Sequence, residues 1–100
     1  MVSLVKKKDK IIGLVAYKIL KKKIHINGLI IDPEFRGKGF TREAMVLAFK
    51  KMPKKLPLEL VVHPHNNSAI SLYLSLNFII KSWSENHFGD GEPRLLMIKK

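Results

Sequence analysis

The chain contains no cysteine, which excludes disulfide scaffolds, thiolate metal sites and cysteine nucleophiles. Uninterrupted apolar runs extend over only a few residues, whereas a membrane-spanning helix needs roughly 20. Lysines at positions 6, 7, 8 and 10 interrupt the apolar stretch that a signal peptide would need after Met1. Residues 1–100 leave room for one domain. These absences favour a single globular domain of cytoplasmic location.

Acidic residues are also scarce, since eight Asp and Glu face nineteen Lys and Arg and leave a net charge of +11. Such a surface attracts polyanions such as nucleic acid, phosphorylated cofactors or acidic partners. A general lysine bias of the genome would give the same balance. Base readout in DNA grooves favours arginine, and only Arg36, Arg42 and Arg94 are present. The charge therefore permits an anionic partner without identifying one, and nucleic acid is not favoured.

The first third of the chain has the composition of three strands joined by polar turns. Val2–Lys7, Ile11–Leu20 and Ile24–Ile31 are rich in β-branched residues and predict an antiparallel meander. Asn27-Gly28 interrupts the third strand, and an internal glycine often marks a bulge or a close approach to the backbone.

After Pro33 the apolar period becomes helical. Met45, Ala48, Phe49 and Met52 share one face of a helix that begins near Phe40 and that Pro53 ends. The remaining pattern predicts a buried strand, a second helix capped within Asn66-Asn67-Ser68 and closed by Asn77, and two final strands: Leu58–Val62, Ala69–Leu76, Phe78–Ser84 and Arg94–Lys99. The expected fold class is α+β (mixed α/β), in the order β-β-β-α-β-α-β-β, with a mostly antiparallel sheet flanked by two helices.

A glycine-rich loop, Arg36-Gly37-Lys38-Gly39, lies between the third strand and the first helix. A helix N-terminus offers unpaired N–H groups and partial positive charge, and glycines let the backbone curl around an anion. The spacing matches neither a Walker A loop nor a dinucleotide-binding fingerprint. On the glycines alone, a pyrophosphate cradle and an ordinary strand-to-helix turn are equally consistent.

A second informative segment, from Asn67 to Phe78, follows a strand and opens the second helix. Taken together, the two segments resemble the GNAT superfamily of N-acetyltransferases. The first family motif, Arg/Gln-x-x-Gly-x-Gly/Ala after a Leu-x-Val-x-Pro strand end, is matched by Arg36, Gly39 and Leu29-Ile30-Ile31-Asp32-Pro33.

The later family motif is Asn-x-Ala-x-x-x-Tyr followed by Leu-Gly-Phe. Its residues here are Asn67, Ala69, Tyr73, Leu76 and Phe78. The resemblance covers about Ile11 to Lys99.

The resemblance implies that acetyl-CoA lies in a gap where the sheet splays, between the strands at 24–31 and 58–62. The pantetheine arm pairs with one strand as a further strand would, and the pyrophosphate rests on amides before the first helix. No metal is implied. The implied cofactor-binding residues are Leu29, Ile30, Ile31, Arg36, Gly37, Lys38, Gly39, Phe40, Thr41 and Asn67.

The resemblance also implies that Tyr73 is the general acid that protonates the departing thiolate. A phenol with a pKa of about 10 is protonated at neutral pH and can donate to sulfur. Without the motif, Tyr73 would be read as a packing residue of a helix.

The general base is expected to be His25, where several relatives place a glutamate. Residues 25, 27, 29 and 31 share one strand face if no bulge intervenes, and a bulge at Asn27-Gly28 would reverse the direction of His25. A surface histidine beside a lysine turn is the alternative reading. Glu59, His63 and His65 are weaker candidates for the base.

The sequence departs from the family pattern at Thr41, where a small residue is usual, and at Asn77, which replaces glycine. The strand and two helices that usually precede the meander have no counterpart before Val2. Three alternatives follow: an open cleft for the acceptor amine of a small molecule, a wall supplied by a second subunit of a homodimer, or a bulky acceptor such as a protein amine. The alternative functions are a catalytically silent CoA-binding module and, less favoured, a small basic nucleic-acid-binding protein.

Overall fold

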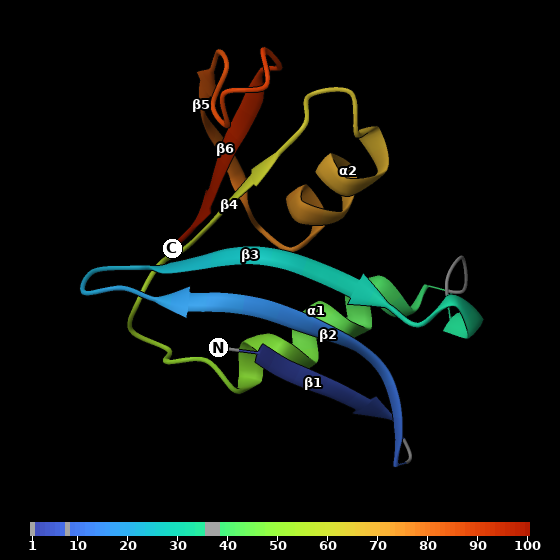
Figure 1. Ribbon diagram of the computed structural model, residues 1–100. Coiled ribbons are helices and arrows are strands. Elements are labelled where there is room, and N and C mark those ends of the chain that lie inside the picture. Colours follow the sequence, from blue (N-terminus) through green and yellow to red (C-terminus); the bar gives the residue numbers. More distant parts are fainter. Residues whose placement is uncertain (1, 8, 36–38) are drawn as a thin grey trace.

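The computed structural model describes residues 2–7, 9–35 and 39–100 (Figure 1). Within them the helices are η1 (Pro33–Phe35), α1 (Phe40–Lys50) and α2 (Asn67–Ser75). The strands are β1 (Val2–Lys7), β2 (Lys10–Ile19), β3 (Ile24–Ile31), β4 (Leu58–Val62), β5 (Ile79–Ser84) and β6 (Arg94–Lys99). The predicted order of elements is confirmed, and every strand begins and ends within one residue of its expected bounds.

The strands form one sheet in the order β1-β2-β3-β4-β6-β5. All neighbours are antiparallel except β3 and β4, which are parallel and pair only from Ile24–Leu58 to Ile26–Leu60. Beyond these residues the two strands diverge (Figure 1). The mostly antiparallel sheet and its splay between β3 and β4 are therefore confirmed.

A β-bulge interrupts β3 where the sequence contains Asn27-Gly28. Ala16 pairs with Gly28 and Tyr17 pairs with Ile26, so Asn27 is the extra residue. Before the bulge the even-numbered side chains of β3 are buried, and after it Ile31 is buried while Ile30 is 58% exposed. The extra residue thus changes which side chains of β3 face the core.

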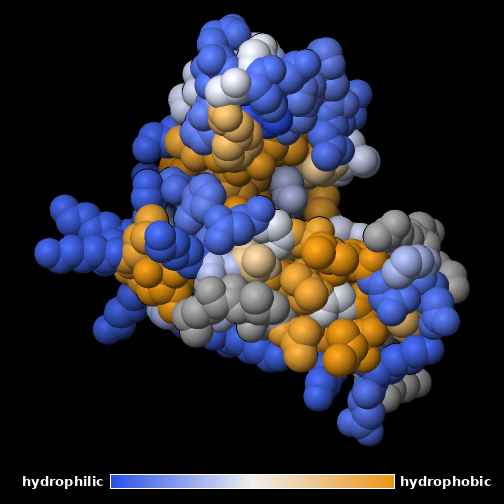
Figure 2. All heavy atoms as spheres, viewed as in Figure 1, coloured by the Kyte–Doolittle hydropathy of each residue, from blue (hydrophilic) through white to orange (hydrophobic). Residues whose placement is uncertain are grey.

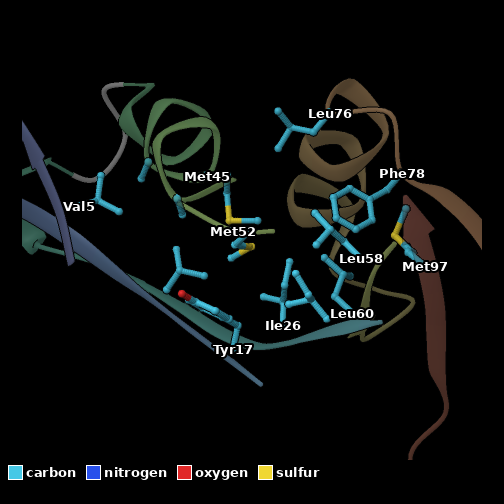
Figure 3. Packing of buried hydrophobic residues seen from close by; sticks show 14 of the residues in the cluster. Val5, Tyr17, Ile26, Met45, Met52, Leu58, Leu60, Leu76, Phe78 and Met97 are labelled. Atoms are coloured by element: carbon cyan, nitrogen blue, oxygen red, sulfur yellow. The ribbon is translucent and has the colours of Figure 1, made fainter. Parts of the chain in front are cut away.

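The core lies between the sheet and the two helices, which cover the same face (Figure 3). Met45, Ala48 and Met52 are buried on one side of α1, and Phe49 packs against the same cluster, as the helical spacing predicts. Figure 3 shows Met45 and Met52 pointing from α1 towards the strands that carry Tyr17 and Ile26. Burial of this apolar stripe anchors α1 to the sheet and so sets the position of its N-terminus.

The opposite face of the sheet carries no helix among the described residues. Leu4, Leu14 and Ile30 are directly opposite one another on β1, β2 and β3, and Leu4 and Ile30 are exposed. Figure 2 shows hydrophobic side chains over this half of the sheet. Neither α1 nor α2 is long and apolar enough to cross a membrane.

Candidate functional site

A pocket of about 460 Å³ lies where the end of β3 meets the first turns of α1 and α2. Both helices follow the carboxyl end of a strand, so their N-terminal ends point to the same region of the sheet. Most of its lining residues belong to α1 and α2. Its lining consists of Leu29, Gly39, Thr41, Arg42, Asn66, Ser68, Ala69, Leu72 and Tyr73.

The α1 side of the pocket has the features of an anion site. Gly39 is the N-cap of α1 and has a φ of 80°, which few residues other than glycine adopt. It has no side chain with which to cap the helix, and a Cβ added there would meet no heavy atom within 4 Å. Thr41 and Arg42 complete this wall with a hydroxyl and a positive charge. The predicted contacts of Arg36, Gly37 and Lys38 lie outside the described residues.

The α2 side differs because its N-terminus is capped. The Oδ1 atom of Asn66 accepts a hydrogen bond from the amide of Ala69 at 3.2 Å. Asn66 and Ser68 both line the pocket, whereas the predicted Asn67 is exposed and is not among the lining residues. The polar contacts that α2 offers to a ligand are therefore those of the neighbours of Asn67.

Tyr73 is one of the residues that α2 contributes to the pocket. Ala69, Leu72 and Tyr73 share one face of α2 through their helical spacing, and the Tyr73 ring lies 5.7 Å from that of Phe78. The hydroxyl has no hydrogen-bond partner among the described residues, and burial raises the pKa of the phenol above its ordinary value of 10.0. Tyr73 is therefore protonated at neutral pH and can donate into the pocket.

The other predicted cofactor residues have different surroundings. Leu29 lines the pocket, while Ile30 and Ile31 continue β3 beyond its last paired residue with β4. Phe40 is half-buried against the ring of Phe35, with 5.2 Å between the ring centroids. Phe40 thus helps to hold the start of α1 rather than to line the cavity.

His25 lies on the face of the sheet opposite the helices. The expectation that it shares a face with residues 27, 29 and 31 holds only for a strand without a bulge. The structure has the alternative, a bulge at Asn27, which reverses the direction of His25 relative to Leu29 and Ile31. Ile24 and Ile26 point into the core, and His25 between them points outward.

The imidazole of His25 pairs with a carboxylate on the neighbouring strand. Its Nδ1 atom is 2.8 Å from Oε1 of Glu59, and the other carboxylate oxygen of Glu59 is 3.0 Å from Nζ of Lys23. Burial raises the pKa of Glu59, but the hydrogen bonds from His25 and Lys23 outweigh it and hold this pKa below its ordinary value of 4.5. Glu59 is therefore a carboxylate at neutral pH, and the Nδ1 atom of His25 is placed to donate a hydrogen bond to it.

The remaining histidine candidates form no comparable arrangement. The Nε2 atom of His63 lies 3.4 Å from a carboxylate oxygen of Glu92, and the ring of His65 is 5.1 Å from that of His63. Within residues 2–7, 9–35 and 39–100, no three His, Asp or Glu side chains are placed to hold a metal ion.

Sequence reasoning missed the lining residues Arg42, Asn66 and Ser68 and underrated Glu59. Arg42 could have been found by its place in the first turn of α1, and Asn66 and Ser68 by their place beside the motif residue Asn67. Glu59 was recognisable as the only polar residue of a buried strand, but its partner could not be read from the sequence because His25 is 34 positions away.

The model of the acetyltransferase (GNAT) family matches residues 1–78. No curated protein of similar sequence was found. Solved structures with a similar fold include the ribosomal-protein-S18-alanine N-acetyltransferase from Escherichia coli, with 20% identity, a TM-score of 0.78, and alignment over 94% of this chain and 64% of that one. A spermidine N-acetyltransferase chimera from Vibrio cholerae and hSSAT has 24% identity and a TM-score of 0.83 over 98% of this chain and 67% of that one.

A third similar structure contains the cofactor that the sequence implies. It is a putative streptothricin acetyltransferase from Bacillus anthracis in complex with acetyl coenzyme A, with 16% identity and a TM-score of 0.75 over 97% of this chain and 60% of that one. This chain therefore spans about two thirds of the length of these three structures. Since the family model covers most of the sequence, the chain belongs to the acetyltransferase (GNAT) family.

Proposed function

We propose that this protein transfers an acetyl group from acetyl-CoA to a primary amine by direct attack. The observation that supports this most strongly is the pairing of two sites at one splay in the sheet. Tyr73 and the N-terminus of α1 line a pocket on the helix-covered side, and His25 with Glu59 lies on the other side just before β3 and β4 separate. A donor and an acceptor that approach from opposite faces could meet at that splay.

Acetyl-CoA supplies the activated acetyl group, and the residues of the first pocket fit it. Amide groups at Gly39 and Thr41, together with Arg42, favour the negative pyrophosphate. Leu29 and Ile30 lie beyond the part of β3 that pairs with β4, so on that side their backbone can pair with an extended arm as it would with a strand. Backbone N–H groups at the splay would polarise the thioester carbonyl and stabilise the developing oxyanion.

His25 removes the proton that the amine carries. A free alkylamine has a pKa of about 10.4 and is mostly ammonium at neutral pH, so it cannot attack until this proton leaves. The Nε2 atom of His25 accepts the proton, and the carboxylate of Glu59 stabilises the resulting imidazolium through Nδ1. Glu59 thus acts through His25 as a positioning residue.

Tyr73 completes the proton transfer at the other end of the reaction. The nitrogen–carbon bond forms, the nitrogen releases its second proton to solvent, and the carbon–sulfur bond breaks as the Tyr73 hydroxyl donates its proton to the departing sulfur. The phenol then regains a proton from solvent. Its raised pKa keeps the hydroxyl protonated until the thiolate develops.

The test combines calorimetric titration with acetyl-CoA and an assay for free thiol with a panel of primary amines. We expect saturable binding of acetyl-CoA and amine-dependent release of thiol. Binding without release by any amine would instead favour a silent CoA-binding module. Absence of binding, together with salt-sensitive binding of DNA, would favour the nucleic-acid alternative.

A further inference from the structure

A second pocket, of about 450 Å³, lies at the opposite end of β3 and β4 from the first. Its lining residues come from the β2–β3 turn, from the segment that connects α1 to β4, and from the start of β4. Strand β5 and the end of β6 complete it. Figure 1 shows that the turn, the connection and the C-terminal end of the chain gather at this end of the sheet. Because β3 and β4 are parallel and pair only at their starts, these starts lie together here, whereas the strands have diverged where β3 reaches the first pocket.

The second pocket is strongly basic. Six ammonium groups surround it against the single acidic side chain of Glu59, and among the described residues only Lys23 of the six has a carboxylate partner. Lys54 donates to the carbonyl of Phe49 at 3.5 Å. An excess of one sign around a concave surface raises the local concentration of the opposite charge. The six lysines are Lys22, Lys23, Lys54, Lys55, Lys81 and Lys100.

The pocket shares Glu59 with the proposed base. One carboxylate oxygen of Glu59 contacts His25, and the other contacts Lys23 in the pocket wall. Ile98, which is directly opposite Glu59 on β6, lines the same pocket with Leu56 and Pro57 and provides an apolar floor. A molecule whose amine reaches His25 would therefore place the rest of its structure beside the lysines.

We infer that the acceptor is a small amine that also carries phosphate or carboxylate groups, and that this second pocket binds them. The inference rests on the proposed function for the role of the amine. A polyamine such as spermidine would bring further positive charge to six ammonium groups, whereas an anionic group would be attracted by them. The pocket has the size and the mixed apolar and charged lining of a small-molecule site.

The test compares three amines that share a two-carbon chain: ethanolamine, β-alanine and O-phosphoethanolamine. Each is titrated calorimetrically into the full chain saturated with CoA, so that the first pocket is filled. We expect β-alanine and O-phosphoethanolamine to bind at least about tenfold more tightly than ethanolamine, and the difference to fall as salt is added. Comparison of the two acids identifies whether carboxylate or phosphate is preferred.

Charge reversal at the pocket provides the matched control. Lys81→Glu should weaken binding of O-phosphoethanolamine by about tenfold or more, because it replaces attraction with repulsion in the wall. Lys6→Glu makes the same change in net charge on β1, at the other edge of the sheet, and should leave binding within about twofold. Equal losses in the two variants, or no saturable binding of either acid, would overturn the inference.

Three further outcomes bear on this inference and on the proposed function. Inorganic phosphate that binds as tightly as O-phosphoethanolamine would show a plain anion site and overturn the acceptor assignment. Thiol release that is equally fast with ethanolamine, spermidine and O-phosphoethanolamine would overturn the inference but leave the acetyltransferase proposal standing. Tight, Lys81-dependent binding of O-phosphoethanolamine without thiol release would support the pocket and contradict the acetyltransferase proposal.

Discussion

The Nδ1 atom of His25 on β3 lies 2.8 Å from the Oε1 atom of Glu59, the residue directly beside it on β4. This contact joins the only two neighbouring strands of the described sheet that pair in parallel, one position before their last pair, Ile26–Leu60. The pair lies on the face of the sheet without helices, whereas Tyr73 belongs to α2, which covers the other face. The proposed base and the proposed acid thus lie on opposite faces of the sheet, and the acetyl group would be transferred at the splay between β3 and β4.

Substitution of either member of the pair should slow amine acetylation at neutral pH. His25→Asn removes the proton acceptor, and Glu59→Gln removes the charge that supports it, so we expect losses of about 100-fold and about tenfold in kcat. The double variant should lose about as much as His25→Asn alone, because the two residues act as one unit. The measurement is thiol release at saturating amine and acetyl-CoA.

The pH dependence distinguishes this role from a structural one. From about pH 7 to about pH 9.5 the amine increasingly loses its proton without help, so the deficit of His25→Asn should shrink. A deficit that stays constant over this range would argue against His25 as the base.

Tyr73→Phe should lower the rate of thiol release by about 100-fold while the affinity for CoA changes less than about twofold. The variant keeps the ring that packs against Phe78 but removes the donor hydroxyl. Tyr17→Phe is the matched control, since it removes the hydroxyl of the other tyrosine, which is buried under α1 and does not line the pocket. Unchanged turnover in Tyr73→Phe would remove this residue from the mechanism.

Gly39→Ala should weaken binding of CoA by about tenfold, because a φ of 80° strains alanine and the first turn of α1 would shift. Gly91→Ala is the control: its φ is 79°, a Cβ there also meets open space, and it lies in the loop before β6. Both variants should lose about 1–2 kcal/mol of unfolding free energy. Only Gly39→Ala should change the affinity for CoA measured by calorimetry. Equal losses of affinity in the two variants would contradict binding of the pyrophosphate at the N-terminus of α1.

Gly13→Ala should destabilise the fold by about 1–3 kcal/mol, measured by urea unfolding. A Cβ at Gly13 would lie 2.6 Å from the carbonyl oxygen of Ile30, which belongs to the paired strand and cannot move aside easily. Gly28→Ala, on β3, meets nothing within 4 Å and should cost less. A Gly28→Ala variant that is the less stable of the two would contradict the close approach of β2 to β3 at Gly13.

Acidification should remove the stabilising contribution of Glu59. Its pKa is lowered in the folded state, so the contribution is complete above the ordinary value of 4.5 and is lost as the pH falls through the lower folded value. The difference in unfolding free energy between the wild type and Glu59→Gln should therefore be larger at neutral pH than below about pH 3. Urea unfolding at both pH values measures this difference. A difference that grows on acidification would contradict a lowered pKa of Glu59 in the folded state.

Local features of the chain were sufficient to predict its elements. The helical spacing of Met45, Ala48 and Met52 predicts the buried face of α1, and Asn77 adopts the positive φ expected of a residue that closes α2. The cap at Asn66 is also visible in the sequence, since a side-chain oxygen three residues before Ala69 suits its amide. Each of these depends on residues within one or two helical turns.

The faces and neighbours of the strands needed the folded chain. Nothing near His25 reveals whether Asn27 pairs or bulges, yet this one residue decides that His25 points away from Leu29. The contact of His25 with Glu59, and the gathering of lysines from a turn, a connection and the last strand, depend on sheet register. Helices and strands follow from short-range backbone preferences, whereas register follows from packing between distant segments, because a shift of one residue exchanges every inward side chain for an outward one.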